Sequence, residues 1–308
     1  MKHYGNHLLR VIVLIIAFLF CFGFSSEAAY DVSFSSQKSP SFYQGINELN
    51  HKNYQKAIIN FTEVIKKDKQ LMAAAYTNRC LAHLQLNHNQ DAKKDCIKAL
   101  TMNADNIEAY LNQGMADYRL GNFSNSLAAY QQVIKRDKND YRAYYNQGLV
   151  YFELQDYQTA LNAYNQALNS NKLQDSYQKS LIYYDRSLAY FKQEEFPQAI
   201  ANLTHAIILD NINDKAYYHR GYAYEKLGNY QAAINDFAEA IALNPQLTVA
   251  YLNRGLSKQK LGFLQAAFQD FTIALEQFQQ QENLTAYQQT LNLIKQLKRI
   301  ISQPIVIA

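Results

Sequence analysis

The side chains of this 308-residue chain that could do chemistry are histidines, cysteines and one acidic pair. Cys80 and Cys96 have no second cysteine pair to complete a metal site, and Glu194 and Glu195, in a turn before Pro197, are expected to be solvated. The histidines beyond the first thirty residues lack the short spacings typical of metal ligands: His51, His83, His88, His205 and His219. The sequence therefore predicts no metal site and no cofactor.

Other catalytic signatures are also missing from the sequence. It contains no glycine-rich phosphate loop and no nucleophile elbow. The formal net charge of +4 is too weak and too scattered to indicate a nucleic-acid partner. With 10 Gly, 4 Pro and 3 Cys, the chain is a poor match to a β-sandwich or a disulfide-rich scaffold. These observations favour a non-catalytic protein.

The elements repeat. A small residue recurs at spacings of 35, 34, 34, 39, 34 and 34, in all but the first copy four positions after a tyrosine: Gly45, Cys80, Gly114, Gly148, Ser187, Gly221 and Gly255. Twelve positions later comes a second small residue: Ala57, Ala92, Ser126, Ala160, Ala199, Ala233 and Ala267. Four further on stands an apolar or aromatic residue, except for a second cysteine: Phe61, Cys96, Tyr130, Tyr164, Leu203, Phe237 and Phe271. The steps of three and four within each copy predict two helices joined by a short turn.

This pattern resembles the tetratricopeptide repeat (TPR) family, whose period of about 34 residues it matches in seven copies. The resemblance implies an all-α fold: a right-handed α-solenoid of antiparallel helix hairpins, the TPR superhelix, with a C-terminal capping helix. We assign seven repeats to residues 41–281, the capping helix to 282–301 and a tail to 302–308. Five extra residues around 169–179 are expected to lengthen a helix or bend the array.

The N-terminal residues are typical of an export signal. Lys2 and Arg10 precede the apolar run Val11–Phe24, and small residues follow. We interpret residues 1–28 as a signal peptide and 29–40 as a linker, which predicts export to a periplasm, a lumen or the medium. The alternative is an uncleaved N-terminal anchor, which would leave the protein membrane-anchored and facing outward.

The cysteines are expected to be reduced. Because Ala92 is the small residue that faces Cys80, Cys96 lies one helical turn beyond that contact. The two Cα atoms are then expected to be more than ~7 Å apart, too far for an undistorted disulfide. We expect free thiols packed in the core.

Arginine recurs immediately before the small residue of the first helix. Such a series could bind an anion, but we interpret it as structural. Arg79, Arg220 and Arg254 each precede an acid by sixteen positions, whereas Gln113 and Gln147 precede alanine. Such covariation predicts ion pairs within hairpins: Arg79–Asp95, Arg220–Asp236 and Arg254–Asp270.

The residue two positions before each small residue is polar, although helix packing does not require a polar side chain there: Asn78, Asn112, Asn146, Asp185, His219 and Asn253. In the TPR family the matching helix lines a concave groove, and an asparagine ladder there binds extended peptides. A side-chain amide both donates and accepts, so it can bind a strand-like backbone of any sequence. The adjacent groove columns are largely apolar and include Met115, Leu149, Tyr145, Tyr184, Tyr218 and Tyr222.

One known TPR binding mode is absent. The column that would supply the first lysine of a carboxylate clamp is mostly apolar, and Arg142 and Lys215 are expected to be isolated cations on the groove side.

The sequence thus predicts a protein-interaction scaffold that holds a partner's extended peptide or helix in its groove, in the assembly or maturation of envelope or lumenal proteins. The alternatives are a structural or oligomerisation module and a regulatory subunit of an enzyme complex. A membrane contact is expected only through an uncleaved anchor.

Overall fold

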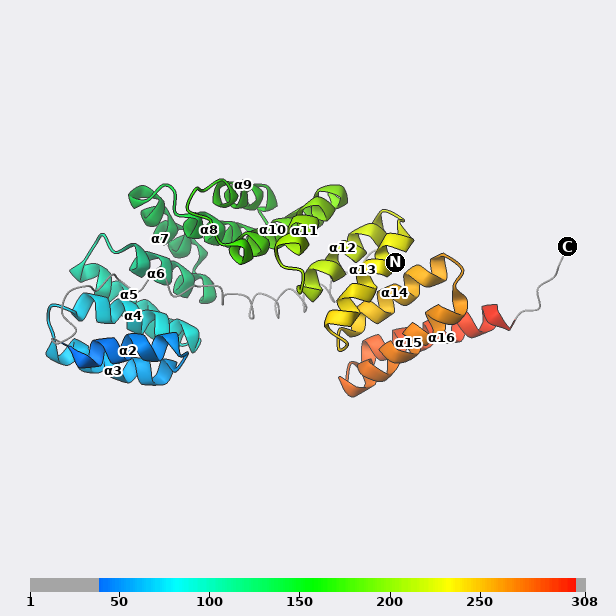
Figure 1. Cartoon of the computed structure of the whole chain (residues 1–308), viewed down its shortest axis with the longest axis horizontal. Coiled ribbons are helices and arrows are strands. Elements are labelled where there is room, and N and C mark those ends of the chain that lie inside the picture. The colour runs from blue at the N-terminus through cyan, green and yellow to red at the C-terminus, as the bar shows by residue number, and fades with distance from the viewer. Residues whose placement is uncertain (1–38, 303–308) are drawn as a thin grey trace. The chain divides into compact units, whose positions relative to one another are not determined.

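The computed structural model describes residues 39–302, so the predicted signal peptide and most of the predicted linker and tail lie outside the described residues. Within this range the chain is helical and forms no strand (Figure 1). The helices are α2 (Pro40–Asn50), α3 (Tyr54–Lys67), α4 (Met72–Gln85), α5 (Asn89–Met102), α6 (Ile107–Arg119), α7 (Phe123–Arg136), α8 (Tyr141–Glu153), α9 (Tyr157–Leu168), α10 (Ser176–Lys192), α11 (Phe196–Leu209), α12 (Asp214–Lys226), α13 (Tyr230–Leu243), α14 (Thr248–Lys260), α15 (Leu264–Gln280) and α16 (Leu284–Ile301).

The helices alternate between the first and second arms of hairpins. The pairs α2–α3, α4–α5, α6–α7, α10–α11, α12–α13 and α14–α15 pack together, and α16 packs on α15. Second helices also contact the next first helix, in the pairs α3–α4, α5–α6, α9–α10, α11–α12 and α13–α14. The fold is the expected α-solenoid of helix hairpins with a C-terminal capping helix, because an amphipathic hairpin covers its apolar faces only by stacking on neighbours.

The chain divides into two compact units, each described by itself. Among residues 39–302, unit 1 contains those up to Val150 together with Asn169–Lys172, and unit 2 contains Tyr151–Leu168 and those from Leu173 onward. The five-residue insertion predicted near 169–179 lies where these segments alternate. It lengthens α10 to 17 residues, compared with 13 in α6, α8, α12 and α14, which confirms the expected longer helix.

The turns inside the hairpins share one backbone device. The second residue after the end of each first helix adopts a positive φ, which reverses the chain and ends the helix. Three hairpins use glycine at this place, with φ of 75°, 77° and 82° at Gly121, Gly228 and Gly262. Other turns place a side chain there, as at Gln155 and Glu194, at a steric cost that glycine avoids.

The small residue of each first helix makes room for a ring of the second helix. A Cβ built on Gly114 would lie 2.4 Å from the Tyr130 ring, and one built on Gly255 would lie 2.6 Å from the Phe271 ring. Ser126, twelve residues after Gly114, donates its hydroxyl to the Gly114 carbonyl at 2.7 Å. The small residue therefore lies between the residues at +12 and +16, and both contact it.

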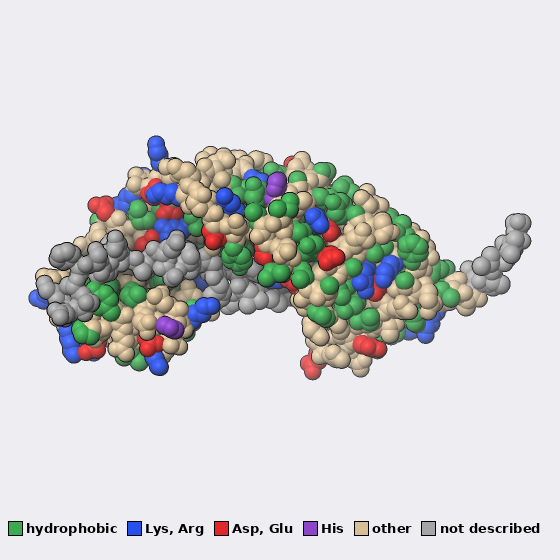
Figure 2. All heavy atoms as spheres, viewed as in Figure 1, with side chains coloured by type: hydrophobic (Ala, Val, Ile, Leu, Met, Phe, Trp, Pro, Cys, Tyr) green, Lys and Arg blue, Asp and Glu red, His purple; other side chains and the backbone are tan. Residues whose placement is uncertain are grey.

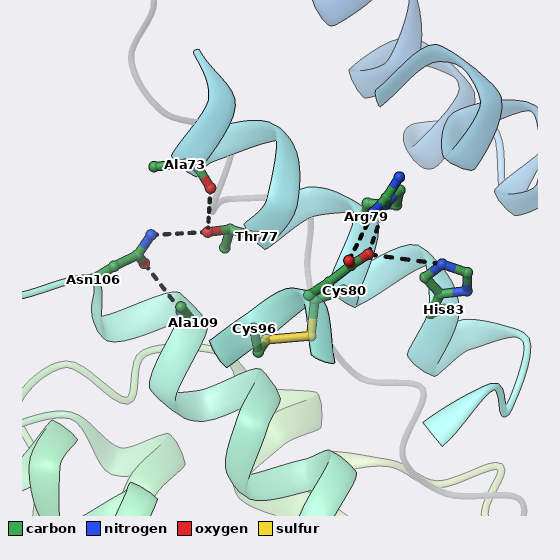
Figure 3. Close-up of a disulfide and its surroundings, with 9 residues drawn as sticks. Ala73, Thr77, Arg79, Cys80, His83, Cys96, Asn106 and Ala109 are labelled. Carbon is green, nitrogen blue, oxygen red and sulfur yellow. Dashed lines mark hydrogen bonds and ion pairs between the residues drawn. A yellow bond between two sulfur atoms is a disulfide. The ribbon is translucent and has the colours of Figure 1, made fainter. Parts of the chain in front are cut away.

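This geometry overturns the prediction of free thiols. Cys80 and Cys96 form a disulfide with their Cα atoms 5.6 Å apart (Figure 3). The prediction was wrong because it placed the helix contact at +12 alone, whereas the second helix presents its +12 and +16 residues together to the small residue. Cys96 thus occupies the place of an aromatic ring, and the covalent bond takes over from the glycine–ring contact. Both cysteines are fully buried.

Candidate protein-interaction surface

The arginine column is structural, as predicted. The Nε and Nη2 groups of Arg79 each donate to a different oxygen of Asp95, both at 2.7 Å, and Arg220 holds Asp236 in the same two-pronged way at 2.7 and 2.8 Å. Arg254 pairs with Asp270. The hydrogen bond to Asp95 is the main cause that raises the pKa of Arg79, opposed by burial. The pairs predicted from covariation are therefore confirmed.

Each of these arginines also has other partners. The Nη1 groups of Arg79 and Arg220 donate to Thr62 and Thr204 on the preceding hairpin, at 2.8 and 3.2 Å. The guanidinium of Arg220 lies 5.7 Å from the centre of the Tyr217 ring, a cation–π distance. With their donors used inside the array, these arginines are poor candidates for anion binding.

The predicted binding residues lie on what we call the first-helix face, the surface formed by the first helices of successive hairpins. In unit 1 this face is tightly packed. Met115 and Asn112 are buried, and Asn146 is 2% exposed with no hydrogen-bond partner for its Nδ2 among the described residues. Asn78 is half-buried and donates to the Ala74 carbonyl at 2.9 Å. The remaining predicted residues of this face, Tyr145 and Leu149, are half-buried.

Arg142 is not the isolated cation expected from the sequence. It donates to Glu108 at 2.8 Å and to Asp140 at 2.7 Å, so it joins the first helices of two hairpins. Burial lowers the pKa of Arg142, but the two carboxylates outweigh it and the pKa is raised. The sequence pattern missed these pairs because Glu108 lies a full repeat away. The second predicted cation, Lys215, is half-buried, and burial lowers its pKa.

Unit 2 brings five of the predicted residues into one aromatic cluster. The His219 ring lies 5.2 Å from the Tyr218 ring and 5.7 Å from the Tyr184 ring, centre to centre. Tyr222 stacks on Tyr218 at 6.5 Å, and Asn253 donates to the Tyr218 hydroxyl at 3.1 Å. These rings come from α10 and α12 and the amide from α14, so the cluster crosses three successive first helices. Asp185, also predicted, is half-buried on α10.

A sixth member of the cluster, Phe191, was not predicted. Its ring lies 6.0 Å from Tyr222 in a stacked arrangement and 5.9 Å from His219. Phe191 stands four positions after the small residue Ser187, where α6 and α8 carry Tyr118 and Phe152. The recurrence of an aromatic residue at this position is the sequence signal from which Phe191 could have been predicted.

Burial controls the protonation of the cluster. The pKa of His219 is lowered to about 4, mainly by burial and secondly by the positive charge of Lys215. The imidazole is therefore neutral near pH 7. Burial also raises the pKa values of Tyr184 and Tyr218, so both phenols keep their protons. The Tyr184 hydroxyl has no hydrogen-bond partner among residues 39–302. The cluster therefore offers uncharged rings and polar groups, which suits apolar and hydrogen-bonding contacts.

The described residues show neither a metal site nor a membrane-spanning element. Between residues 39 and 302, no group of three or more histidine, cysteine or acidic side chains is placed to bind a metal ion. In the same range no helix is both long and apolar enough to cross a membrane. Charged side chains of both signs are interspersed on the face shown in Figure 2.

Comparisons with known proteins give the same fold. Family models described as tetratricopeptide repeat match residues 111–175 and 214–247, and a model described as TPR repeat matches 188–228. Human sperm-associated antigen 1 is 33% identical over 90 residues, which are 29% of this chain and 10% of that protein. The chain thus spans about a tenth of the length of this relative.

Solved structures cover more of the chain. The crystal structure of MamA is 26% identical, with a TM-score of 0.51, over 55% of this chain and 96% of MamA. YrrB, described as a TPR protein with an unusual peptide-binding site, is 21% identical with a TM-score of 0.52, over 59% of this chain and 91% of YrrB, and supports the fold alone. Together with the helix hairpins, the family-model matches identify the chain as a member of the tetratricopeptide repeat family.

Proposed function

We propose that this chain is a non-catalytic interaction scaffold of an exported compartment, and that it binds an extended segment of a partner protein on its first-helix face. TPR arrays are protein–protein interaction scaffolds, and the proposal adds the compartment, the surface and the form of the partner. The roles we infer are assembly or maturation of envelope or lumenal proteins.

The observation that carries the proposed surface is the aromatic cluster of unit 2. Tyr218, His219 and Tyr222 are half-buried, so each residue keeps some exposed surface that a partner can contact. Aromatic side chains supply much of the binding energy in protein interfaces because they bury a large area with few rotatable bonds. Asn253, which is half-buried, adds a side-chain amide to the same cluster, and an amide can accept from or donate to a peptide backbone.

The disulfide supports the exported compartment. A buried Cys80–Cys96 bond joins the two helices of one hairpin, and structural disulfides persist where the environment is oxidising. The apolar run at Val11–Phe24 supports the same conclusion from the sequence. In a reducing cytosol the same two cysteines would be expected to remain thiols.

The test of the surface compares a variant of the cluster with a control variant on a second helix. Tyr218→Ala with Tyr222→Ala removes two rings of the cluster, whereas Ile208→Ala truncates a residue on α11 that is 73% exposed. Each purified protein serves as bait in an extract of cell envelopes, with the melting temperature measured in parallel. We expect the double variant to lose the partners that wild type and Ile208→Ala retain. Retention by all three would refute the proposed surface.

A second function, self-association, rests on a different observation. An open apolar hollow of about 570 Å³ lies at the C-terminal end of unit 2, lined by Phe263, Leu264, Ile300 and Ile301 among others. Phe263 and Ile300 are about half exposed. Light scattering over a range of protein concentrations would favour this function if it found a stable oligomer that Phe263→Asp dissociates.

A further inference from the structure

Apolar side chains outside the aromatic cluster are exposed at the C-terminal end of unit 2. Leu261, Phe263, Ile300 and Ile301 are between 39 and 53% exposed. The last three line the open hollow that lies where α15 begins and α16 ends, and Leu261 precedes Gly262, another lining residue. Helices α15 and α16 pack side by side in this part of the chain (Figure 1). We call Leu261, Phe263, Ile300 and Ile301 the C-terminal apolar patch.

The capping role of α16 does not explain the patch. A helix that ends a solenoid is expected to present a polar outer face, and α16 does so at its exposed residues Gln288, Asn292 and Gln296. Its last turn instead exposes Ile300 and Ile301. Apolar side chains that are exposed together are typical of a surface that contacts another molecule.

The exposed charges of α16 are all positive. From Asn283 to Ala308 the sequence contains three basic residues and no acid. The three lie in the last two turns of α16 and are exposed, and we call them the α16 bases: Lys295, Lys298 and Arg299. None of them forms an ion pair with a described acid. The Nζ atom of Lys298 lies 5.4 Å from the centre of the Phe268 ring, near the start of α15 and thus near the hollow.

The acids of the neighbouring helices do not neutralise the α16 bases. Helix α14 has no acid, and on α15 Asp270 is 2% exposed and pairs with Arg254 and Lys258. The other acid of α15, Glu276, stands about 18 Å along that helix from its first residue. Glu282 precedes α16, at the end of that helix opposite to the patch.

Acids on earlier helices interact with other bases. Glu225 of α12 acts electrostatically on Lys260, the last residue of α14, so we do not count Lys260 with the α16 bases. On α13, which packs on α14, Asp236 pairs with Arg220. Glu239, the other acid of α13, stands about 14 Å along that helix from its first residue. The surface around the C-terminal apolar patch is therefore apolar and positively charged.

Exposed apolar side chains do not by themselves select a partner, as a second group on unit 2 shows. Ile208 and Ile212 are 73 and 74% exposed. Asp210 lies between them in the sequence, and burial, Asp210 and Asp175, in that order, raise the pKa of Tyr177. Negative charge thus accompanies these two isoleucines, whereas positive charge accompanies the C-terminal apolar patch. Of the two groups, only the patch matches an anionic surface.

We propose that the C-terminal apolar patch docks on the surface of an anionic lipid bilayer. Phe263, Ile300 and Ile301 enter the boundary between the headgroups and the acyl chains, and the α16 bases lie beside the lipid phosphates. Binding of this kind combines buried apolar area with attraction to anionic lipids. The six residues after Ser302 carry no charged side chain, and three of them are isoleucine or valine, so the sequence stays apolar beyond α16.

A lipid surface fits this end of unit 2 better than a second copy of the chain does. Two copies that meet at the patch would bring their α16 bases close together, and like charges oppose association. Lipid phosphates neutralise the same bases. Docking on a bilayer does not depend on the partner of the first-helix face, so either can fail without the other.

The test measures binding to lipid vesicles. The protein used is residues 29–308, which remain after the predicted cleavage and contain all the described helices, so that the apolar run Val11–Phe24 cannot contribute. Co-sedimentation compares vesicles of phosphatidylcholine with vesicles in which about a third of the lipid is phosphatidylglycerol, at low salt and at ~0.3 M salt. The melting temperature of every variant is measured in parallel.

The charge variant is Lys298→Glu with Arg299→Glu, which reverses two of the α16 bases. Its matched control is Lys66→Glu with Lys69→Glu, which makes the same change of charge at exposed positions in unit 1.

The apolar variant is Phe263→Ser with Ile300→Ser. Its matched control is Ile208→Ser with Ile212→Ser, which removes two apolar side chains that are still more exposed. Ile300→Ser with Ile301→Ser replaces the apolar variant if that variant does not fold.

We expect the protein to bind the anionic vesicles at least tenfold more tightly than the neutral ones at low salt, and this preference to shrink at high salt. The charge variant and the apolar variant should each lose at least tenfold of the binding to anionic vesicles, and both controls should keep it.

Equal binding to the two kinds of vesicle, or binding to neither, would overturn the proposal, and so would equal losses in the variants and their controls. A stable oligomer in light scattering that the apolar variant dissociates, without vesicle binding, would assign the patch to a second copy of the chain instead.

Discussion

Arg220 and Asp236 hold the two helices of one hairpin together through two hydrogen bonds of 2.7 and 2.8 Å, and the arginine reaches Thr204 on the preceding hairpin as well. The pair is mostly buried. The arginine therefore fixes the two helices relative to each other, and few of its N–H groups remain for a partner. Its role is structural, unlike that of the aromatic residues on the same first helix.

Removing one member of this pair should destabilise the protein. Arg220→Gln leaves the Asp236 carboxylate buried without its partner, at an expected cost of about 1–3 kcal/mol in the free energy of unfolding. Arg220→Gln combined with Asp236→Ala recreates the Gln113–Ala129 combination of the third hairpin and should recover part of that loss. Urea denaturation measures both. A double variant no more stable than the single one would contradict the interpretation of these residues as a pair.

The disulfide should contribute to stability. It closes a loop of 16 residues, which in the chain-entropy model corresponds to about 3 kcal/mol. Cys80→Ser with Cys96→Ser should therefore lower the melting temperature, and a reducing agent should lower that of wild type but not that of the variant. Cys80→Gly with Cys96→Phe restores the packing pair of other hairpins and should be more stable than the serine variant. Equal melting temperatures for wild type with and without reductant would show that the bond is not formed.

Replacing a glycine by alanine should lower the free energy of unfolding for a different reason at Gly114 than at Gly121. Gly114→Ala forces a Cβ to 2.4 Å from the Tyr130 ring, so the ring must move, at about 1–3 kcal/mol. A Cβ on Gly121 meets no atom within 4 Å, so Gly121→Ala should cost only the backbone strain of its φ of 75°, about 1–2 kcal/mol. Replacing Tyr130 by Leu should relieve Gly114→Ala and leave Gly121→Ala unchanged, as measured by denaturant unfolding. Relief of both would count against the contact.

The neutral His219 predicts an acid-sensitive stability. Its folded-state pKa is about 4, whereas free histidine titrates near ~6.5. Between these values the unfolded chain binds more protons, so stability is fully present above about pH 6.5 and falls as the pH drops toward 4. His219→Asn carries the residue found at the matching place of α14, Asn253, and should lose less stability over this range. Melting temperatures across the window, with exposed His205→Asn as the control, test this. Parallel curves for wild type and His219→Asn would contradict it.

The sequence predicted most of the fold because its signals are local and repeated. The 34-residue spacing of Gly114, Gly148 and their equivalents gave the hairpins and their order, and sixteen-residue covariation gave the Arg–Asp pairs. The disulfide could not be derived in this way. Spacing along one helix does not determine which turn of the facing helix a residue meets, and Cys80 contacts both the +12 and the +16 positions.

The candidate surface was only partly predictable for a similar reason. The columns next to the small residue contain Tyr218, His219 and Tyr222, and the structure groups these rings. Phe191 lies a further turn along its first helix, and only side-chain packing shows that it joins the same cluster. Burial was the other quantity that the sequence lacked, since Asn112 and Asn146, predicted as exposed amides, are buried.

The most direct measurement places a photoreactive amino acid at Tyr222, on the first-helix face, or at Ile208, on the second helix α11, in the full chain expressed in its native cells. After irradiation, adducts are separated by mass and identified. We expect a partner protein crosslinked at position 222 and not at position 208. A partner crosslinked at 208 and absent at 222 would contradict the claim that the first-helix face of unit 2 binds the partner.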